Sequence, residues 1–240
     1  MKRDYKIKSI KEYLDTVLDI TGNNSCWYRG QQENWSLIPK IGRLKISLAN
    51  IKKQEKYIFE HFWKYSHPYI DSSDFNVWDK LCIAQHHNLP TRLLDWTHCP
   101  LTALYFAIND KKKESYPDGV VYIFKSEYNR VNILEIKDPF MIEDVFTFTP
   151  SHITNRVVAQ RGNFTIHPPN FKQFNSDGSL KKRTFPIIIE GKYKFKIRKD
   201  LESIFGINDF TLFRNLDSIG FHLHWKAENM KEENNGVRGR

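Results

Sequence analysis

The pattern of hydrophobic and polar positions predicts helices in the first part of the chain. Ser9 followed by Glu12 has the spacing of a capping box, which satisfies free backbone N–H groups where a helix begins. Apolar residues then recur every three or four positions, as they do in a helix with one buried face. The same spacing predicts helices over 49–65, 74–88 and 101–109, the last apolar on nearly every side. The buried stripe predicted for the first helix consists of Tyr13, Leu14, Val17 and Leu18.

Strand-like segments dominate the rest of the chain, as short runs of β-branched and aromatic residues. Phe185–Glu190 and Tyr193–Arg198 flank Gly191 and predict a hairpin. Helices over 199–205 and 211–230 would close the fold. The other predicted strands cover 26–28, 91–96, 120–124, 133–136, 145–148 and 156–166.

Helices come first and strands follow, with no repeat, linker or low-complexity tract between them. This order favours a single α+β domain over residues 1–230, with a helical N-terminal half packed on a mostly antiparallel sheet. Residues 231–240 are polar, and we expect them to form a flexible tail.

The composition indicates a folded protein of the cytoplasm. Hydrophobic residues make up 40% of the 240 residues, which is enough for a sizeable core. No apolar run reaches the roughly 18 residues that a membrane span needs. The Lys-rich start has no apolar core, so we expect no secretory signal. Three cysteines (Cys26, Cys82 and Cys99) are too few for a disulfide framework and fit a reducing compartment.

The formal net charge of +9 is unevenly distributed. The balance is 12 − 7 = +5 in residues 1–60, 10 − 12 = −2 in 61–160 and 15 − 9 = +6 in 161–240. Basic flanks of this kind are found in nucleic-acid-binding proteins. The alternative is that these lysines simply form an ordinary solvent-exposed surface, and no Arg-rich tract stands out.

Three polar clusters carry the candidate chemistry. In the first, W-Y-R-G-Q (27–31), Arg29 precedes a glycine that would let a ligand approach the backbone. Arg29 could equally form a structural, buried ion pair with Asp95, which lies in the second cluster. The third cluster, 156–164, contains Gln160 and Gly162, and the glycine could also mark an ordinary β-bulge.

The second cluster, Gln85–Thr97, is the densest. His86 could act as a general base or orient a ligand. A metal alternative rests on His86, His87, His98 and Cys99, but their spacing fits no standard zinc pattern, so we expect no metal. The candidate catalytic residues are Arg29, His86, Gln160 and Glu190, and the candidate ligand-binding residues are Gly30, Gln31, Gln85, Thr91, Arg92, Asp95, Trp96, Thr97 and Gly162.

Together these clusters resemble the FRG domain family, named for a Phe-Arg-Gly motif that reads Tyr28-Arg29-Gly30 here. The other segments that fit the family are 35–39 with Arg43, Q-H-H-N-L-P-T-R-L-L-D-W-T (85–97), A-L-Y-F-A (103–107), R-V-V-A-Q-R-G-N-F (156–164) and the L-F…L-D of 212–217. The resemblance covers about residues 20–225. The chain departs from it where Tyr28 replaces Phe and where Arg214 and Ser218 replace Pro and Gly.

The layout of these clusters is also similar to that of ADP-ribosyltransferases, which hold NAD in a cleft between two sheets. That similarity implies that Arg29 would grip a phosphate, while Thr91 and Thr97 would shape the nicotinamide-ribose side. A late-strand group would stabilise the cationic ribose, a role that usually needs Glu. Gln160 lies in the motif without a charge, and Glu190 has the charge but lies outside the motifs.

Three hypotheses therefore stay open. The first is an NAD-consuming enzyme, similar to an ADP-ribosyltransferase or a glycohydrolase, whose ligand is nucleotide-like and whose polar cleft surrounds Arg29 and residues 85–97. The second is a non-enzymatic interaction module in which the motifs only hold the fold. The third is a nucleic-acid-binding or nucleic-acid-processing domain that uses the basic flanks. No hypothesis involves a membrane.

Overall fold

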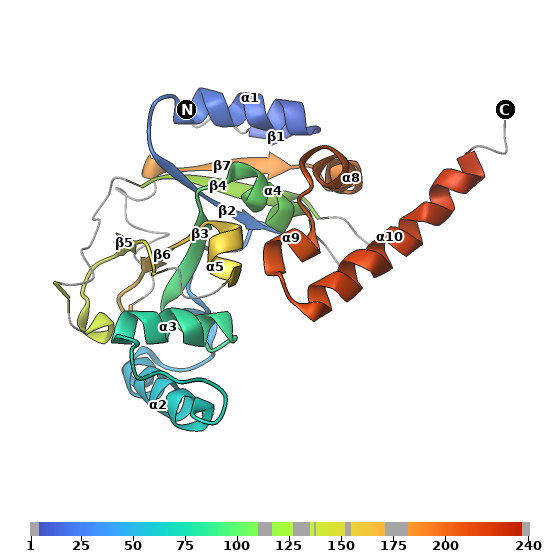
Figure 1. Cartoon of the computed structure of the whole chain (residues 1–240). Coiled ribbons are helices and arrows are strands. Elements are labelled where there is room, and N and C mark those ends of the chain that lie inside the picture. Colours follow the sequence, from blue (N-terminus) through green and yellow to red (C-terminus); the bar gives the residue numbers. More distant parts are fainter. Residues whose placement is uncertain are drawn as a thin grey trace.

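The computed structural model describes residues 5–109, 117–126, 135–136, 138–151, 155–170 and 182–236 (Figure 1). Over these residues the chain forms one sheet in the order β1-β7-β4-β2-β3-β6-β5. Strands β1 and β7 are parallel and all other neighbours are antiparallel. The strands are β1 (Tyr5–Ile7), β2 (Cys26–Gln31), β3 (Leu93–Thr97), β4 (Gly119–Lys125), β5 (Phe146–Phe148), β6 (Gly162–Ile166) and β7 (Thr184–Ile189).

Helices cover this sheet, which confirms the predicted α+β class (Figure 1). The α-helices are α1 (Ile10–Thr21), α2 (Leu48–Ser66), α3 (Val77–His86), α4 (Pro100–Ile108), α5 (Asn155–Gln160), α8 (Lys194–Phe205), α9 (Asp209–Phe213) and α10 (Leu216–Gly236). Short 3-10 helices are η1 (Lys40–Arg43), η2 (Pro139–Met141) and η3 (Gly191–Tyr193). Helix α10 projects from the body, and residues 237–240 of the predicted tail lie outside the described part.

The predicted start of α1 is confirmed. The Ser9 hydroxyl accepts a hydrogen bond from the backbone N–H of Glu12 at 3.2 Å. The Glu12 carboxylate accepts one from the N–H of Lys8 at 2.9 Å, one residue earlier than in a standard capping box. The predicted buried stripe is partly wrong, because Leu18 is 69% exposed. The buried positions are Ile10, Tyr13, Val17 and Thr21.

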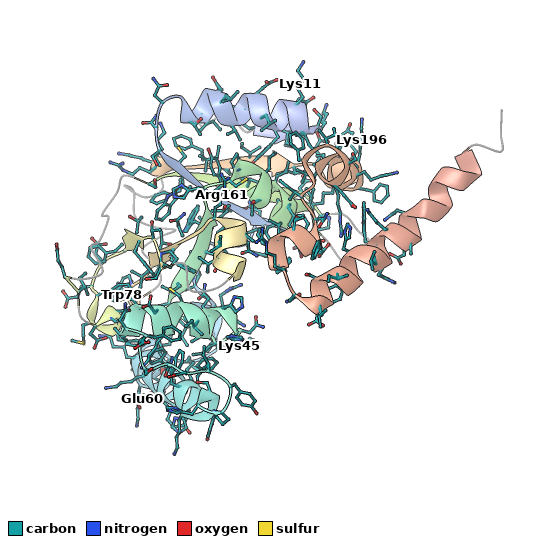
Figure 2. All side chains as sticks on the ribbon, in the orientation of Figure 1. Lys11, Lys45, Glu60, Trp78, Arg161 and Lys196 are labelled. Atoms are coloured by element: carbon teal, nitrogen blue, oxygen red, sulfur yellow. The ribbon has the colours of Figure 1, made fainter. Side chains whose placement is uncertain are left out.

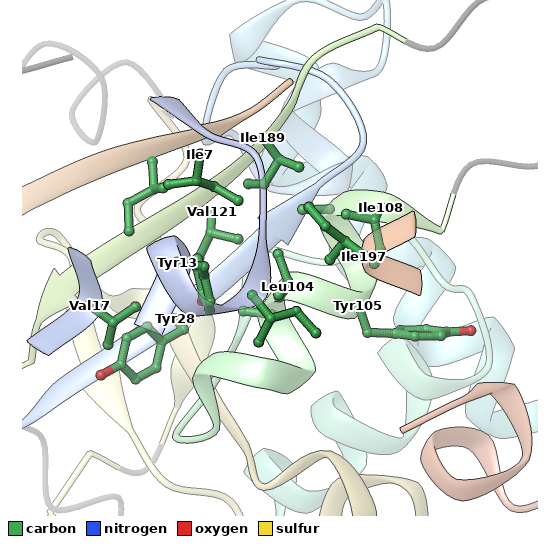
Figure 3. Packing of buried hydrophobic residues seen from close by; sticks show 14 of the residues in the cluster. Ile7, Tyr13, Val17, Tyr28, Leu104, Tyr105, Ile108, Val121, Ile189 and Ile197 are labelled. Carbon is green, nitrogen blue, oxygen red and sulfur yellow. The ribbon is translucent and has the colours of Figure 1, made fainter. Parts of the chain in front are cut away.

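The largest hydrophobic core lies between helices and the β1-β7-β4-β2 half of the sheet (Figure 3). Ile7, Val121 and Ile189 reach it from the strands, whereas Tyr13 and Leu104 reach it from α1 and α4. Helix α4 is buried on nearly all sides, as its sequence predicts. Separate clusters of buried side chains fill the space around β3, β5 and β6.

Strand β2 continues through Arg29 and Gly30 to Gln31, and the predicted end at Tyr28 is wrong. It pairs with β4 along its whole length, from Cys26 opposite Lys125 to Gln31 opposite Val120. On its other edge β2 meets β3 at a single pair of residues, Tyr28 and Thr97. Beyond that pair the two strands diverge, so the sheet consists of a β1-β7-β4-β2 half and a β3-β6-β5 half.

Two predicted strand segments are helical instead. Residues 155–160 form α5, and Arg161, with a φ of +48°, turns the chain into β6. The segment 193–198 contributes to η3 and α8 rather than to a hairpin, since the buried residues Lys194, Ile197 and Leu201 follow helical spacing. Residues 135–136 are not a strand, and the rest of the predicted strand 133–136 lies outside the described residues.

Gly30 is the point where α4 packs directly on β2. A β-carbon placed there would lie 1.8 Å from the carbonyl oxygen of Ala103 and 2.8 Å from the backbone nitrogen of Ala107. Real atoms do not approach this closely, so any larger residue must separate the helix from the strand. The glycine of the Tyr28-Arg29-Gly30 motif therefore has a structural role in packing.

Gly30→Ala should lower the free energy of unfolding by about 3 kcal/mol or more, because the methyl group would meet backbone atoms that cannot turn away. Urea denaturation measures this. Gly220→Ala in α10 is the matched control, because nothing lies within 4 Å of its β-carbon position. The control should be neutral or stabilising by up to about 1 kcal/mol. Equal stabilities for the two variants would contradict the close packing of α4 on β2.

Candidate functional site

A pocket of about 280 Å³ opens where β2 and β3 diverge. Its walls come from β2, η1, the end of α3, β3, α4, α5 and β6. The structure brings nine of the predicted site residues to this pocket. They are Arg29, Gly30, Gln85, His86, Asp95, Trp96, Thr97, Gln160 and Gly162. We call it the β2–β3 pocket.

Arg29 bridges the two halves of the sheet. Its Nη1 donates a hydrogen bond to the backbone carbonyl of Asp95 at 2.7 Å and lies 3.6 Å from that residue's Oδ2. The Arg29 side chain is 16% exposed, and this burial lowers the pKa of its guanidinium. The carboxylate of Asp95 opposes that shift, and the nearby charge of Arg43 adds to it. An arginine remains protonated at neutral pH despite such a shift.

Asp95 is the accessible member of this ion pair. The predicted ion pair is present, but its predicted burial is wrong for Asp95, whose side chain is 64% exposed. Leu93, Leu94 and Trp96 are buried, whereas Asp95 points out of the same strand into the pocket. Among the described residues that line the pocket, Asp95 is the only carboxylate.

A chain of hydrogen bonds fixes the orientation of Asp95. The Nε2 of Gln85 donates to Oδ1 of Asp95 at 2.9 Å. The hydroxyl of Thr91 donates to Oε1 of Gln85, which determines which end of the amide faces Asp95. Thr91 itself is buried and does not line the pocket. Its position indicates a supporting role, behind the residues that a ligand would touch.

Two further cations reach the pocket from η1, and they were absent from the candidate residues of the sequence. Lys40 Nζ donates to the backbone carbonyl of Asn88 at 2.7 Å. Arg43 is exposed at the pocket, and no carboxylate of the described residues lies within ion-pair distance of its guanidinium. Only its place in the family-like segment pointed to Arg43, because some 40 to 50 residues separate it from the 85–97 cluster.

Other predicted residues hold the walls of the pocket together. The hydroxyl of Thr97 donates to the backbone carbonyl of Gln160 at 2.5 Å, and Nε2 of Gln160 donates to the carbonyl of Leu212 at 3.3 Å. The indole N–H of Trp96 donates to Thr165 at 2.9 Å. Gly162 has room for a β-carbon, since the nearest atom would be 3.6 Å away. These contacts tie β3, α5 and α9 together around the opening.

Arg92 lies in the core, away from the pocket lining. It is 1% exposed and forms an ion pair with Glu55 of α2, which is 2% exposed. Its Nη1 also donates to the carbonyls of Pro139 and Phe140, at 3.3 and 3.2 Å. These ion-pair and hydrogen-bond partners all lie within the protein, so this arginine connects α2, η2 and the start of β3.

Gln31 and Glu190 also lie outside the pocket lining. Gln31 supports Arg29 from behind: with its amide oriented to satisfy both ends, it accepts from Arg29 Nε at 3.3 Å. Glu190 follows β7, which β4 separates from β2, and its carboxylate pairs with Lys192 at 3.5 Å. Gln160, by contrast, reaches the pocket.

The described residues include no group of three or more His, Cys, Asp or Glu side chains arranged to hold a metal ion. Nor do they include a helix long and apolar enough to cross a membrane.

Comparison with protein families gives a match to the FRG domain over residues 24–116. The chain contains an FRG domain. The match includes the Tyr28-Arg29-Gly30 motif and the 85–97 segment, and therefore both strands that flank the pocket. Residues 156–164 and 212–217, where the sequence predicts further resemblance to the family, lie beyond the matched range. No curated protein and no solved structure matches the chain.

The Arg92–Glu55 ion pair should be essential to stability. Glu55→Ala would leave a buried, uncompensated guanidinium, and we expect the free energy of unfolding to fall by about 3–5 kcal/mol. The double variant Glu55→Leu/Arg92→Met should be more stable than Glu55→Ala, because it removes both charges. Urea denaturation compares them, with the exposed Arg43→Ala as a control that should change stability by no more than about 0.5 kcal/mol. An unchanged midpoint for Glu55→Ala would contradict the structural role of Arg92.

Proposed function

We propose that the FRG domain binds a phosphate-bearing, nucleotide-like ligand in the β2–β3 pocket, and that this ligand is NAD. The observation that carries the proposal is the charge of the lining, where Arg29, Lys40 and Arg43 converge and Asp95 supplies a single carboxylate. Arginine and lysine side chains are the usual protein partners of phosphate groups.

The arrangement of these cations suits a diphosphate. Arg43 is exposed and has a full set of donors for phosphate oxygens. Arg29 is held in place by Asp95 and Gln31, so its guanidinium need not be reordered when a ligand arrives. A volume of about 280 Å³ is near the lower end of ligand pockets, which run from roughly 300 to 1,000 Å³. It would enclose one nucleotide half of NAD.

The reaction that fits this lining is cleavage of the bond between C1′ of the ribose and the nitrogen of nicotinamide. The electron pair of that bond leaves with nicotinamide, which becomes neutral, and the ribose becomes a cation. Asp95, held by Gln85, would stabilise this cation through its negative charge. Water then adds to C1′ and releases a proton, giving ADP-ribose; an acceptor nucleophile in place of water would give ADP-ribosyl transfer.

The layout supports this proposal independently of the charges. The sheet divides at the Tyr28–Thr97 pair, and the pocket lies between its two halves. The similarity to ADP-ribosyltransferases implies the same arrangement, in which NAD lies in a cleft between two sheets. In this chain Asp95 would take the place that the similarity assigns to a late-strand Glu.

Arg43→Ala should weaken the binding of ADP-ribose at least tenfold, because it removes charge-assisted hydrogen bonds to phosphate. Isothermal titration calorimetry measures this. Lys45→Ala is the matched control: Lys45 is exposed, lies two residues away and does not line the pocket. The control should bind as the wild type does. Equal losses in both variants, or no binding by the wild type, would contradict the proposed phosphate site.

Asp95→Asn should abolish nicotinamide release while leaving ADP-ribose binding within about threefold. The amide keeps an oxygen for Gln85 but loses the charge that stabilises the ribose cation. Chromatographic detection of nicotinamide in NAD incubations measures the effect, which we expect to be at least 100-fold. A wild type that binds ADP-ribose but releases no nicotinamide would support the non-enzymatic module instead.

A further inference from the structure

The outer face of α2 carries aromatic side chains where a surface helix usually carries only charges. Tyr57 is 58% exposed and Tyr65 is 68% exposed. His61 lies between them at the i, i+4 spacing that aligns side chains along a helix. Its ring centroid is 3.9 Å from that of Tyr57 and 5.9 Å from that of Tyr65. The three rings form a continuous aromatic row on the solvent side.

Lysines flank this row. Lys53 continues it by one turn, and Lys56 and Lys64 lie on the adjacent row; all three are exposed. Glu60 is the acidic residue among them, and Lys56 pairs with it at 3.9 Å. The other acidic residue of α2, Glu55, is buried against Arg92 and adds no charge to the outer face. The face is therefore basic as well as aromatic.

The inner face of α2 holds this helix against the body of the protein. Ile51 and Trp63 are buried, at 2% and 8% exposure, and Glu55 is held in the core. The helix is thus anchored without the aromatic row. Helices α1 and α2 lie at opposite ends of the molecule (Figure 1), and Figure 2 labels Lys11 on α1 and Glu60 on α2.

We infer that the outer face of α2 binds single-stranded nucleic acid. Exposed aromatic rings stack on unpaired bases of any sequence, and lysines beside them neutralise the phosphates that follow. A duplex hides the faces of its bases, so it could use only the lysines. This surface is separate from the β2–β3 pocket, which no residue of α2 lines, and the inference does not depend on NAD binding.

The test is fluorescence anisotropy with a labelled 12-nucleotide oligo-dT or oligo-U, titrated with the full chain at several salt concentrations. Tyr57→Ala/Tyr65→Ala should bind at least tenfold more weakly, with an unchanged salt slope. Lys53→Gln/Lys64→Gln should reduce the slope of log K against log salt by about 1.4, because each phosphate contact on a single strand contributes about 0.7.

Lys8→Gln/Lys11→Gln is the matched control. Lys11 lies on α1 at the opposite end of the molecule, Lys8 lies between β1 and α1, and both are exposed. Their loss changes the net charge equally. It should keep affinity within twofold. Equal weakening by the control, tighter binding of a duplex of equal length, or no binding by the wild type at 50 mM salt would overturn the inference. A complete loss of oligonucleotide binding in Arg43→Ala would also overturn it, because the nucleic acid would then bind in the β2–β3 pocket. All substitutions are at exposed positions, and unchanged melting temperatures confirm that the variants fold.

Discussion

One backbone pairing determines where the pocket of this molecule opens. Strands β2 and β3 are adjacent in the sheet but share only the Tyr28–Thr97 pair. Where they diverge, the carbonyl of Asp95 accepts its hydrogen bond from the Arg29 side chain, which holds the two halves together in place of a ladder bond. The pocket opens there, and Asp95, Gln85 and Gln160 are among the polar residues that line it.

The FRG motif residues divide into those that hold the fold and those that face the pocket. Gly30 lets α4 approach β2, and Arg92 neutralises Glu55 inside the core. Asp95 has its carboxylate at the opening. Residues of one motif segment, such as Arg92 and Asp95, thus have different roles.

Local signals predicted the parts of the structure that depend on local physics. The Ser9 cap and the buried surface of α4 both follow from sequence. The sequence predicts a strand over 156–166, yet residues 155–160 fold as α5 against α9. Tertiary contacts override such weak preferences. Arg43 was missed as a site residue for a similar reason, since only the folded chain brings η1 beside β3.

We propose above that phosphate-bearing ligands bind in the β2–β3 pocket. Hydrogen–deuterium exchange with and without saturating ADP-ribose tests it most directly. If the ligand binds in the pocket, exchange should be slower in peptides covering η1 and the turn after α3, which carry Lys40, Arg43 and Asn88. Peptides covering β7 and Glu190, on the other side of β4, should not change. Protection around Glu190 with none at η1 would contradict the account.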